Sequence, residues 1–111
     1  MYVRIITGTL QTILRVLGMG HDILTAVVAP RVHTQLLPDL VDIENHTYFA
    51  DTPTVAINLP ISTRAFLTSH GHTLVPQGGF ANVQVVTVDP DTSLIEAVSD
   101  PRKDGRPAGW S

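Results

Sequence analysis

Two arginines of this chain stand at positions where a side chain can be held firmly enough to do chemistry. Arg31 directly follows Pro30, and Arg102 directly follows Pro101, each just beyond a segment that we predict to be regular. A guanidinium group is planar and always charged, so it can bind a carboxylate or carbonyl oxygens through two parallel hydrogen bonds. Direct substrate contact and a structural tie between loop and core are both open. We favour the structural tie, with Asp100 as a candidate partner.

The other residue types with chemical potential form no persuasive pattern. His70 and His72 flank a glycine and could join His33 in binding zinc, but no carboxylate or thiolate stands at ligand spacing. The glycine between them is typical of a helix end. Thr7 and two nearby threonines lack any sequence context that would place a base beside them. We therefore predict no metal site, no cofactor and no catalytic residue in this chain.

Length and charge exclude several classes of protein. The 111 residues carry a net charge of −3 and no cysteine. A chain of this length forms one domain at most. Its scattered lysines and arginines form no basic stripe, so we expect no nucleic-acid partner. Without cysteine, neither disulfides nor a thiolate metal site can form. The apolar stretch at residues 5–17 is interrupted by polar side chains and is too short to span a bilayer.

The first thirty residues predict two helices. Between residues 5 and 17, aliphatic side chains recur at helical spacing and form one apolar stripe. Gly18 and Gly20 should end this helix, because glycine adopts the left-handed conformation at a helix C-terminus without steric cost. Asp22 can cap a second, short helix, which should end before Pro30.

The middle of the chain predicts extended structure, a loop and a third helix. Residues 31–44 alternate imperfectly and are broken at Pro38. The buried positions of this segment are expected to be Val32, Leu36, Val41 and Ile43. Turn formers interrupt residues 45–59, which we interpret as a surface loop. The third helix is predicted for residues 61–69, with Ser62 or Thr63 near its cap and Gly71 as its stop.

The last third of the chain predicts an antiparallel hairpin followed by a coil. Residues 83–88 have a period of two, residues 89–93 form a turn, and residues 94–98 return as a second strand. Both faces of the first strand are largely apolar, which is typical of a strand inside a layered α/β sandwich. We therefore expect the hairpin to be central. The glycine- and charge-rich tail at residues 102–111 predicts an ordered coil.

Two motifs together resemble the small subunit of gamma-glutamyltransferases. Residues 29–38 read A-P-R-V-H-T-Q-L-L-P after a helix, and residues 100–110 read D-P-R-K-D-G-R-P-A-G-W. The family has A-P-R-x-H-x-Q-x-L-P and D-P-R-x-x-G-x-x-x-G-aromatic segments, in this order and at about this separation. The resemblance covers nearly the whole chain, as the C-terminal part of a small subunit. The motif positions that we take as structural candidates are Arg31, His33, Asp100, Arg102 and Gly105.

The resemblance implies an α+β fold of a known type. Residues 1–111 would be a single partial domain, an incomplete part of the four-layer α/β/β/α sandwich of N-terminal nucleophile hydrolases. The family transfers or hydrolyses the gamma-glutamyl group of glutathione with an N-terminal threonine. That threonine and the paired glycines of the oxyanion hole precede the position of Arg4, where the resemblance begins. We therefore expect strand edges or apolar surface to be left uncovered. The resemblance also implies an extracellular, periplasmic or membrane-attached parent.

Three functions are compatible with these features. In the first, the chain is a C-terminal fragment of a gamma-glutamyltransferase or glutathione hydrolase, inactive alone, which packs with the upstream part or the large subunit. Glutathione would then be met only in the complete enzyme. In the second, the chain is a noncatalytic light-chain-like module that binds or regulates a full-length relative. In the third, it is an independent small enzyme that uses its histidines. We expect the first.

Overall fold

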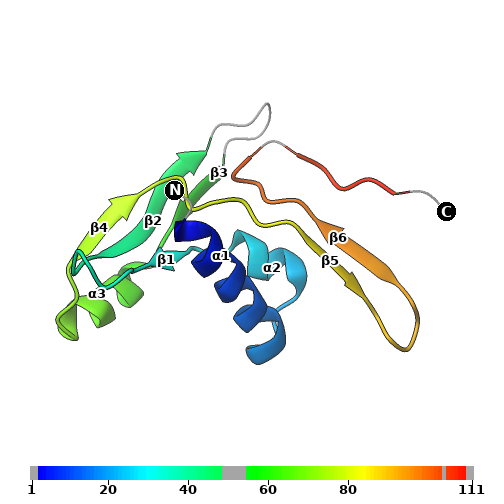
Figure 1. Cartoon of the computed structure of the whole chain (residues 1–111), viewed down its shortest axis with the longest axis horizontal. Helices are drawn as coiled ribbons and strands as arrows, with labels where there is room; N and C mark the ends of the chain where they lie inside the picture. The colour runs from blue at the N-terminus through cyan, green and yellow to red at the C-terminus, as the bar shows by residue number, and fades with distance from the viewer. Residues whose placement is uncertain (1–2, 49–54, 104, 110–111) are drawn as a thin grey trace.

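A helical segment opens the chain. The computed structural model describes residues 3–48, 55–103 and 105–109. Helix α1 (Val3–Ile13) continues into a π-helical turn, η1 (Leu14–Gly18), and is followed by α2 (Ile23–Val28) (Figure 1). Gly20 lies between them with a φ of +70°, a conformation that glycine adopts without a Cβ penalty. The two predicted helices and the glycine break between them are confirmed.

The start of α2 follows from its capping residue. Asp22 has an extended backbone, and its Oδ1 accepts the backbone N–H of Thr25 at 2.7 Å. Its other oxygen accepts the hydroxyl of the same threonine at 3.0 Å. A carboxylate in this position satisfies N–H groups that have no partner within the helix. The predicted N-cap is confirmed, and the helix ends at Val28, two residues before Pro30.

A four-stranded sheet is built around its longest strand. Its strands are β1 (Val32–His33), β2 (Val41–Tyr48), β3 (Val55–Asn58) and β4 (Leu74–Gln77). β1 and β3 pair antiparallel with β2, whereas β4 pairs parallel with it. Strand β3 and helix α3 (Ile61–Ser69) together form the connection from β2 to its parallel neighbour β4, which a tight turn could not make. A small core forms where Leu59 packs with Val41 and Ile43 of β2.

The predicted loop at residues 45–59 is wrong. β2 runs on through Tyr48, and β3 occupies Val55–Asn58. The two strands pair from Asn45 opposite Asn58 to Tyr48 opposite Val55. Asn58, one of the turn formers that suggested a loop, is instead the last residue of β3. Residues 49–54, which also belonged to the predicted loop, lie outside the described residues.

Three finer expectations also fail. Leu36, predicted to be buried, is 76% exposed and has a φ of +72°, because the chain turns there before the break at Pro38. Helix α3 spans the predicted residues, but its N-cap is Pro60, and no side chain caps it. Strand β4 was not predicted, because its four residues, which include Pro76, are too few to show a period. Gly71 ends α3 with a φ of +88°, as expected.

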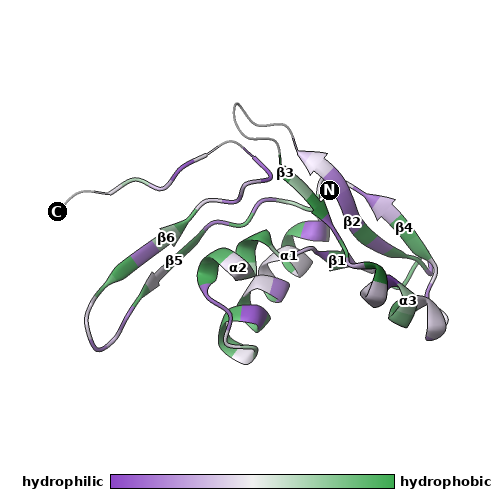
Figure 2. Cartoon of the chain, turned by 180° about the vertical axis from the view of Figure 1, so that it is seen from behind, coloured by the Kyte–Doolittle hydropathy of each residue, from purple (hydrophilic) through white to green (hydrophobic). Residues whose placement is uncertain are grey.

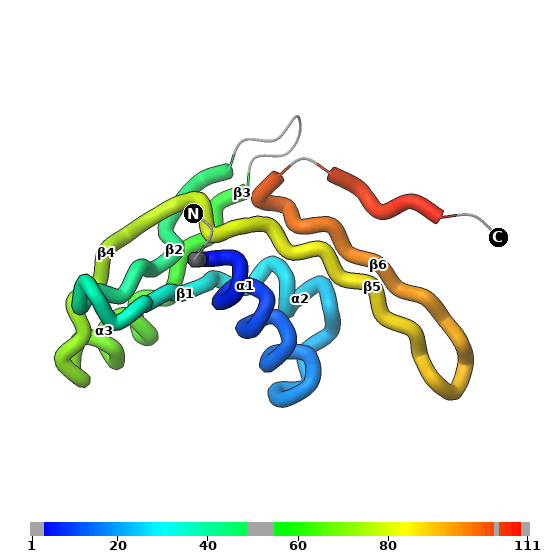
Figure 3. The backbone as a smooth tube through the Cα atoms, in the orientation of Figure 1, coloured from blue at the N-terminus to red at the C-terminus, as the bar shows by residue number. Residues whose placement is uncertain are grey.

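The second sheet is a hairpin of two strands. β5 (Val85–Val88) and β6 (Ile95–Val98) pair antiparallel, with Val85 opposite Val98. The predicted hairpin is confirmed, but its central position is not. Figures 1 and 3 show it extending away from the four-stranded sheet. The radius of gyration is 15.3 Å, whereas a compact domain of this length has about 13 Å.

The exposure of the hairpin has a physical reason. Val86 is 67% and Ile95 is 66% exposed. A strand that is apolar on both faces needs a covering layer on each side. Among the described elements, α2 contacts both strands of the hairpin, and no third strand pairs with it. Apolar surface continues on α1, where Ile6 is 74% exposed, and on η1, where Leu17 is 81% exposed (Figure 2). The expectation of uncovered apolar surface is confirmed.

The fold as described combines helices with sheets, in agreement with an α+β class. No helix among the described residues is long and apolar enough to cross a membrane. The predicted coil tail begins with a turn at Pro101 and Arg102, and residues 105–109 are extended and exposed. Residues 104, 110 and 111 of that tail lie outside the described residues.

Candidate functional site: a buried ion cluster

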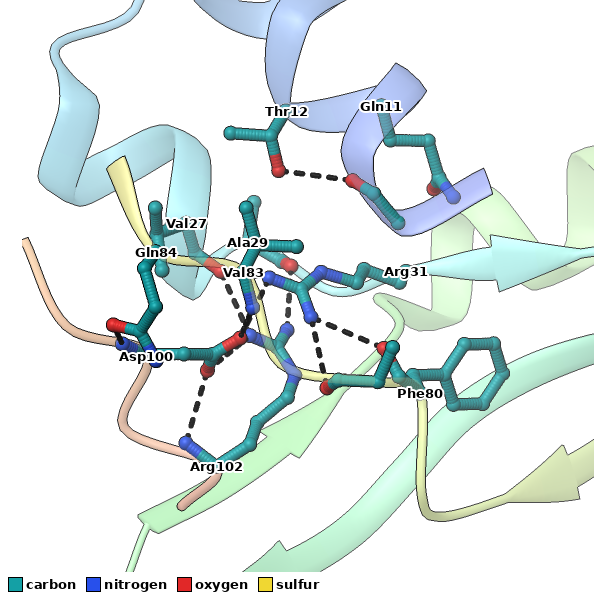
Figure 4. A network of polar contacts seen from close by, with 12 residues as sticks. Gln11, Thr12, Val27, Ala29, Arg31, Phe80, Val83, Gln84, Asp100 and Arg102 are labelled. Carbon is teal, nitrogen blue, oxygen red and sulfur yellow. Dashed lines mark hydrogen bonds and ion pairs between the residues drawn. The ribbon is translucent and has the colours of Figure 1, made fainter. Parts of the chain in front are cut away.

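Four charged side chains meet beneath α2, and we call them the buried ion cluster. They are Arg31, Glu44, Asp100 and Arg102. Arg31 follows α2, Glu44 lies on β2, and the other two follow β6. Each side chain is at most 1% exposed. Figure 4 shows Arg31, Asp100 and Arg102 converging from segments that are distant in the sequence.

Asp100 joins the two arginines. Its Oδ2 lies 2.9 Å from Nη2 of Arg31, and its Oδ1 lies 3.0 Å from Nη1 of Arg102. Oδ2 also accepts the backbone N–H of Val83 at 2.9 Å, and Oδ1 accepts the backbone N–H of Arg102 at 3.0 Å. Each carboxylate oxygen therefore accepts from two donors, which compensates for the burial of its charge. The contact with Arg31 agrees with the partner suggested by the sequence.

Glu44 binds the other side of Arg102. Nε and Nη2 of the guanidinium donate to the two carboxylate oxygens, with Nη2 at 2.7 Å from Oε1. This is the bidentate geometry that favours arginine over lysine. The same carboxylate accepts the backbone N–H of Arg31 at 3.1 Å and the hydroxyl of Tyr48 at 2.6 Å. Glu44 on β2 thus binds both the backbone of Arg31 and the side chain of Arg102.

The remaining guanidinium donors bind backbone carbonyls at the end of α2 and in the loop that follows β4. Nη1 of Arg102 donates to the carbonyl of Val27 at 2.7 Å, and Nη2 donates to the carbonyl of Ala29 at 2.9 Å. Arg31 donates to the carbonyls of Val27 and Phe80, each at 3.1 Å. The last carbonyls of a helix have no partner within it. The two arginines therefore cap α2 from its C-terminal side, where positive charge is also favoured.

The charges of the cluster perturb one another. Burial alone would raise the pKa of the Asp100 carboxyl, but Arg102, the backbone N–H groups of Arg102 and Val83, and Arg31 outweigh it, so that pKa lies below its ordinary value. Burial lowers the pKa of Arg31, and the charge of Arg102 lowers it further. For Arg102, burial is outweighed by Glu44 and Asp100, which raise its pKa. All three side chains are ionised at neutral pH.

Tyr48 completes the cluster at the far end of β2. Burial, followed by its hydrogen bond to Glu44, raises the pKa of the Tyr48 hydroxyl to about 12. The sequence did not identify Glu44 as part of the ion cluster, nor Tyr48 as the residue that binds it. A signal for Glu44 existed, because two buried arginines with one aspartate leave one charge unmatched. Glu44 is the acidic residue that follows the buried position Ile43 directly, which interrupts the alternation of the strand.

His33 lies apart from the ion cluster. Its Nδ1 lies 2.8 Å from the hydroxyl of Thr7 on α1, and its Nε2 lies 3.3 Å from Oε1 of Gln35. The side-chain amide of Gln35 donates to the carbonyl of Leu37, so its oxygen faces His33 and must accept from Nε2. The Thr7 hydroxyl also lies 3.3 Å from the carbonyl oxygen of Arg4, to which it can donate its single hydrogen. The structure therefore places an imidazole beside Thr7, which the sequence context of Thr7 did not predict.

The Thr7 and His33 pair is better explained as a structural contact than as a catalytic one. The imidazole of His33 is 6% exposed. A nucleophile also needs donors preorganised around the developing oxyanion. Thr7 lies in the fifth position of α1, beyond the first four backbone N–H groups that a helix leaves free. The contact ties α1 to β1, as does Gln11, whose amide nitrogen donates to the carbonyl of Val32 at 2.7 Å.

Gly105 is exposed in the coil that follows the ion cluster and takes no part in it. Within the described ranges, no three histidine, aspartate or glutamate side chains are arranged to hold a metal ion. Most donors and acceptors of the ion cluster are bonded to each other and to backbone, whereas Nε of Arg31 has no hydrogen-bond partner within the described residues. A cavity of about 180 Å³ adjoins the cluster and is lined by Tyr48 and Arg102. The bonded geometry suits the cluster to joining chain segments.

Similarity to known proteins covers the region of both arginine motifs. The sequence profile described as gamma-glutamyltranspeptidase matches residues 3–110. Among curated proteins, glutathione hydrolase 2 of Arabidopsis thaliana is 36% identical over 112 residues, which covers 96% of this chain and 19% of the relative. Glutathione hydrolase 3 of the same plant is 30% identical over 126 residues, covering 94% of this chain and 19% of the relative. The chain thus spans about a fifth of these relatives.

Solved structures give the same result. The T380A mutant of Helicobacter pylori gamma-glutamyltranspeptidase superposes with a TM-score of 0.73 and 33% identity, covering 88% of this chain and 48% of that one. An acivicin-inhibited gamma-glutamyltranspeptidase superposes with a TM-score of 0.72 and 32% identity, covering 87% of this chain and 47% of that one. The latter structure is described as revealing critical roles for that enzyme's C-terminus in autoprocessing and catalysis.

Proposed function

The chain belongs to the gamma-glutamyltranspeptidase family, and we propose that it acts as the C-terminal portion of a small subunit that is catalytic only with the rest of the enzyme. The family reaction would be transfer or hydrolysis of the gamma-glutamyl group of glutathione. The chain spans 47% to 48% of the solved chains that it matches, and the nucleophile and oxyanion hole would come from the remainder.

The buried ion cluster is the observation that carries this proposal. Arg31 and Arg102 come from the two motifs on which the family resemblance rests, and both bind Asp100 in the interior. Removing one partner of such a cluster leaves an uncompensated buried charge, which costs about 3–5 kcal/mol. The two motifs therefore supply a structural tie that holds the C-terminal segment against α2. That role agrees with the importance of the C-terminus in a matched enzyme.

The exposed apolar surface supports assembly with further polypeptide. Leu17, Val86 and Ile95 are each more than 60% exposed, and the hairpin has no third strand among the described residues. We propose that the absent portion adds strands to the hairpin and covers its outer face. This would complete the four-layer α/β/β/α sandwich, with the β5–β6 hairpin inside it. Burying apolar surface of this kind contributes roughly 25 cal/mol for each Å².

The proposal can be tested by fragment complementation. Arabidopsis glutathione hydrolase 2 would be truncated just before the region that matches this chain, and the purified chain would be added to it. The chain alone should release no p-nitroaniline from gamma-glutamyl-p-nitroanilide, and the mixture should restore turnover. A matched control is the chain with Arg102→Leu, which should complement poorly because the ion cluster is broken.

The results also separate the alternatives. Hydrolysis by the chain alone, abolished by Thr7→Val, would overturn the proposal in favour of an independent enzyme. Binding to the full-length relative without rescue of the truncated one would indicate the noncatalytic module. We expect neither result, because the exposed apolar residues of the hairpin favour assembly with further polypeptide.

A further inference from the structure

Two cavities adjoin between the helical segment and the hairpin. Each has a volume of about 290 Å³, and they share Val16 of η1 and Thr87 of β5 as lining residues. We call these two adjoining cavities together the hairpin trough. Figure 1 shows α2 and the hairpin that flank it. Nothing in the family reaction as proposed above accounts for this feature.

The two halves of the trough differ in chemistry. The half nearer α1 is lined by aliphatic side chains, among them Ile13, Leu17 and Val85. The half nearer the hairpin turn has an apolar floor that includes Ile23 and Leu94. It is rimmed by three carboxylates, Asp22, Asp89 and Glu96, and no lysine or arginine lines it. The trough is thus apolar at one end and acidic at the other.

The acidic end is charged at neutral pH. The backbone N–H and then the hydroxyl of Thr25 lower the pKa of Asp22. The backbone N–H groups of Thr92 and Asp91 lower the pKa of Asp89. His21 also lines this end, and its Nδ1 is a buried atom without a hydrogen-bond partner within the described residues. This end therefore offers acceptors and negative charge above an apolar floor.

We propose that the hairpin trough binds a segment of the absent portion of the small subunit, with aliphatic side chains in its apolar half and a lysine or arginine in its acidic half. Long basic side chains suit such a site, because the aliphatic stem packs on apolar surface while the cation stays at a polar rim. Charge complementarity of this kind selects partners and orientation. The inference deepens the proposed function and rests on it.

The size of the cavity agrees with this occupant. The acidic half of the trough has a volume of about 290 Å³. It is sufficient for one long side chain and its flanking backbone. The occupant must come from outside the described chain, since the solved chains that match are about twice as long as the part covered here.

The direct test uses a small probe and the chain itself. N-acetyl-arginine methylamide would be titrated into the ¹⁵N-labelled chain and compared with the neutral isostere N-acetyl-citrulline methylamide. The arginine probe should shift the backbone amides of Ile23, Val88 and Leu94. Glu96→Gln should weaken its binding by about 2- to 5-fold, the range expected for one exposed charge. Added salt should weaken it further, because exposed charges are screened.

A matched control removes an exposed carboxylate that does not line the trough. Asp39→Asn changes the net charge by the same amount as Glu96→Gln, and Asp39 is exposed in the loop before β2. It should leave the affinity for the arginine probe unchanged. Circular dichroism would verify that both variants keep the fold. Glu96 is a suitable choice because it is exposed on β6, whereas Asp22 caps a helix and Asp89 holds a turn.

Several outcomes would overturn the inference. Equal binding of the arginine and citrulline probes would remove the role of charge, and equal effects of Glu96→Gln and Asp39→Asn would remove the role of the site. A third is available from complementation. If Glu96→Lys restored the truncated relative as well as the native chain does, the trough would not receive a basic side chain. The proposed function would survive that result, since assembly itself would still occur.

Discussion

Arg102 uses every nitrogen of its guanidinium group. Nε and Nη2 bind Glu44, Nη1 binds Asp100, and both Nη atoms also donate to backbone carbonyls at the end of α2. Such saturation compensates for the cost of burying a charge, which is several kcal/mol for each ion. At the residue scale, the C-terminal segment is held by one side chain whose shape matters as much as its charge.

The first prediction concerns that shape. Arg102→Lys should lower the free energy of unfolding by about 2–3 kcal/mol, because lysine keeps the charge but loses the planar fork. Urea denaturation followed by circular dichroism would measure the change. Arg106→Lys, at an exposed position of the tail, is the matched control and should be neutral. Equal stability of the two variants would contradict a structural role for the ion cluster.

The second prediction concerns Tyr48 and alkaline pH. The folded chain ionises this hydroxyl at a pKa of about 12, against an ordinary value of 10.0. The stability contributed by the neutral hydroxyl is complete below pH 10 and is lost as the pH rises through about 12, because the unfolded chain ionises first.

The measurement compares two proteins between pH 9 and pH 12. Stability of the native chain should fall with pH more steeply than that of Tyr48→Phe, which has no hydroxyl to ionise. Absorbance at 295 nm should show a tyrosine that titrates late in the native chain and is missing from the variant. Parallel stability curves would argue against burial of this hydroxyl at Glu44.

At the element scale, strand β2 organises the molecule. Its first half pairs with β1 and β4 and carries Glu44, whereas its second half pairs with β3. The segment that follows β4 then passes close to the exposed side of β2. Gly78 lies in that segment, and a Cβ added to it would stand 2.8 Å from Cγ of His46. Only a glycine lets the backbone approach the imidazole so closely.

The third prediction tests that close approach. Gly78→Ala should destabilise the chain by about 1–3 kcal/mol, the usual cost of an overpacked contact. The double variant with His46→Ala should recover most of the loss, because the clashing ring is gone. Thermal denaturation would compare both with Gly18→Ala, where an added Cβ meets nothing within 4 Å. A failure of His46→Ala to relieve the effect would place its cause elsewhere.

At the scale of the whole molecule, charged side chains are fully buried in the interior while large apolar side chains remain exposed at the surface. Arg31, Glu44 and Asp100 are entirely buried, whereas Leu17 is 81% exposed. A soluble monomer rarely leaves large contiguous apolar patches open to water. Among the described strands, none pairs with the outer edges of the hairpin, and open edges are templates for pairing with another chain. These features agree with the proposal that further polypeptide covers the hairpin.

The fourth prediction follows from this surface. The isolated chain should self-associate at micromolar concentration and bind a hydrophobic dye such as ANS, as measured by light scattering and fluorescence. Adding the truncated plant relative should reduce both signals, because the same surface becomes buried. A monodisperse, dye-free monomer with cooperative unfolding would instead indicate a module that is stable by itself.

Local patterns determined the elements that depend on few neighbours. The stripe of residues 5–17, the cap at Asp22 and the stop at Gly71 each act within one or two helical turns, so the sequence was sufficient for all three helices. The hairpin was likewise predictable from its period and its turn. The arginine motifs of residues 29–38 and 100–110 indicated both the family and the partner of Arg31.

The tertiary structure alone decided which distant residues meet and what remains uncovered. Glu44 binds Arg102, and Tyr48 binds Glu44, only because the fold brings β2 to the segment that follows β6. The interrupted alternation at Glu44 indicated a buried charge but not its partner. Strand β4 was missed because it depends on parallel pairing with β2, a partner about thirty residues away in the sequence. The apolar alternation of the hairpin predicted burial, but burial requires a covering layer. Residue types determine what must be covered, and the spatial arrangement of the chain determines what covers it.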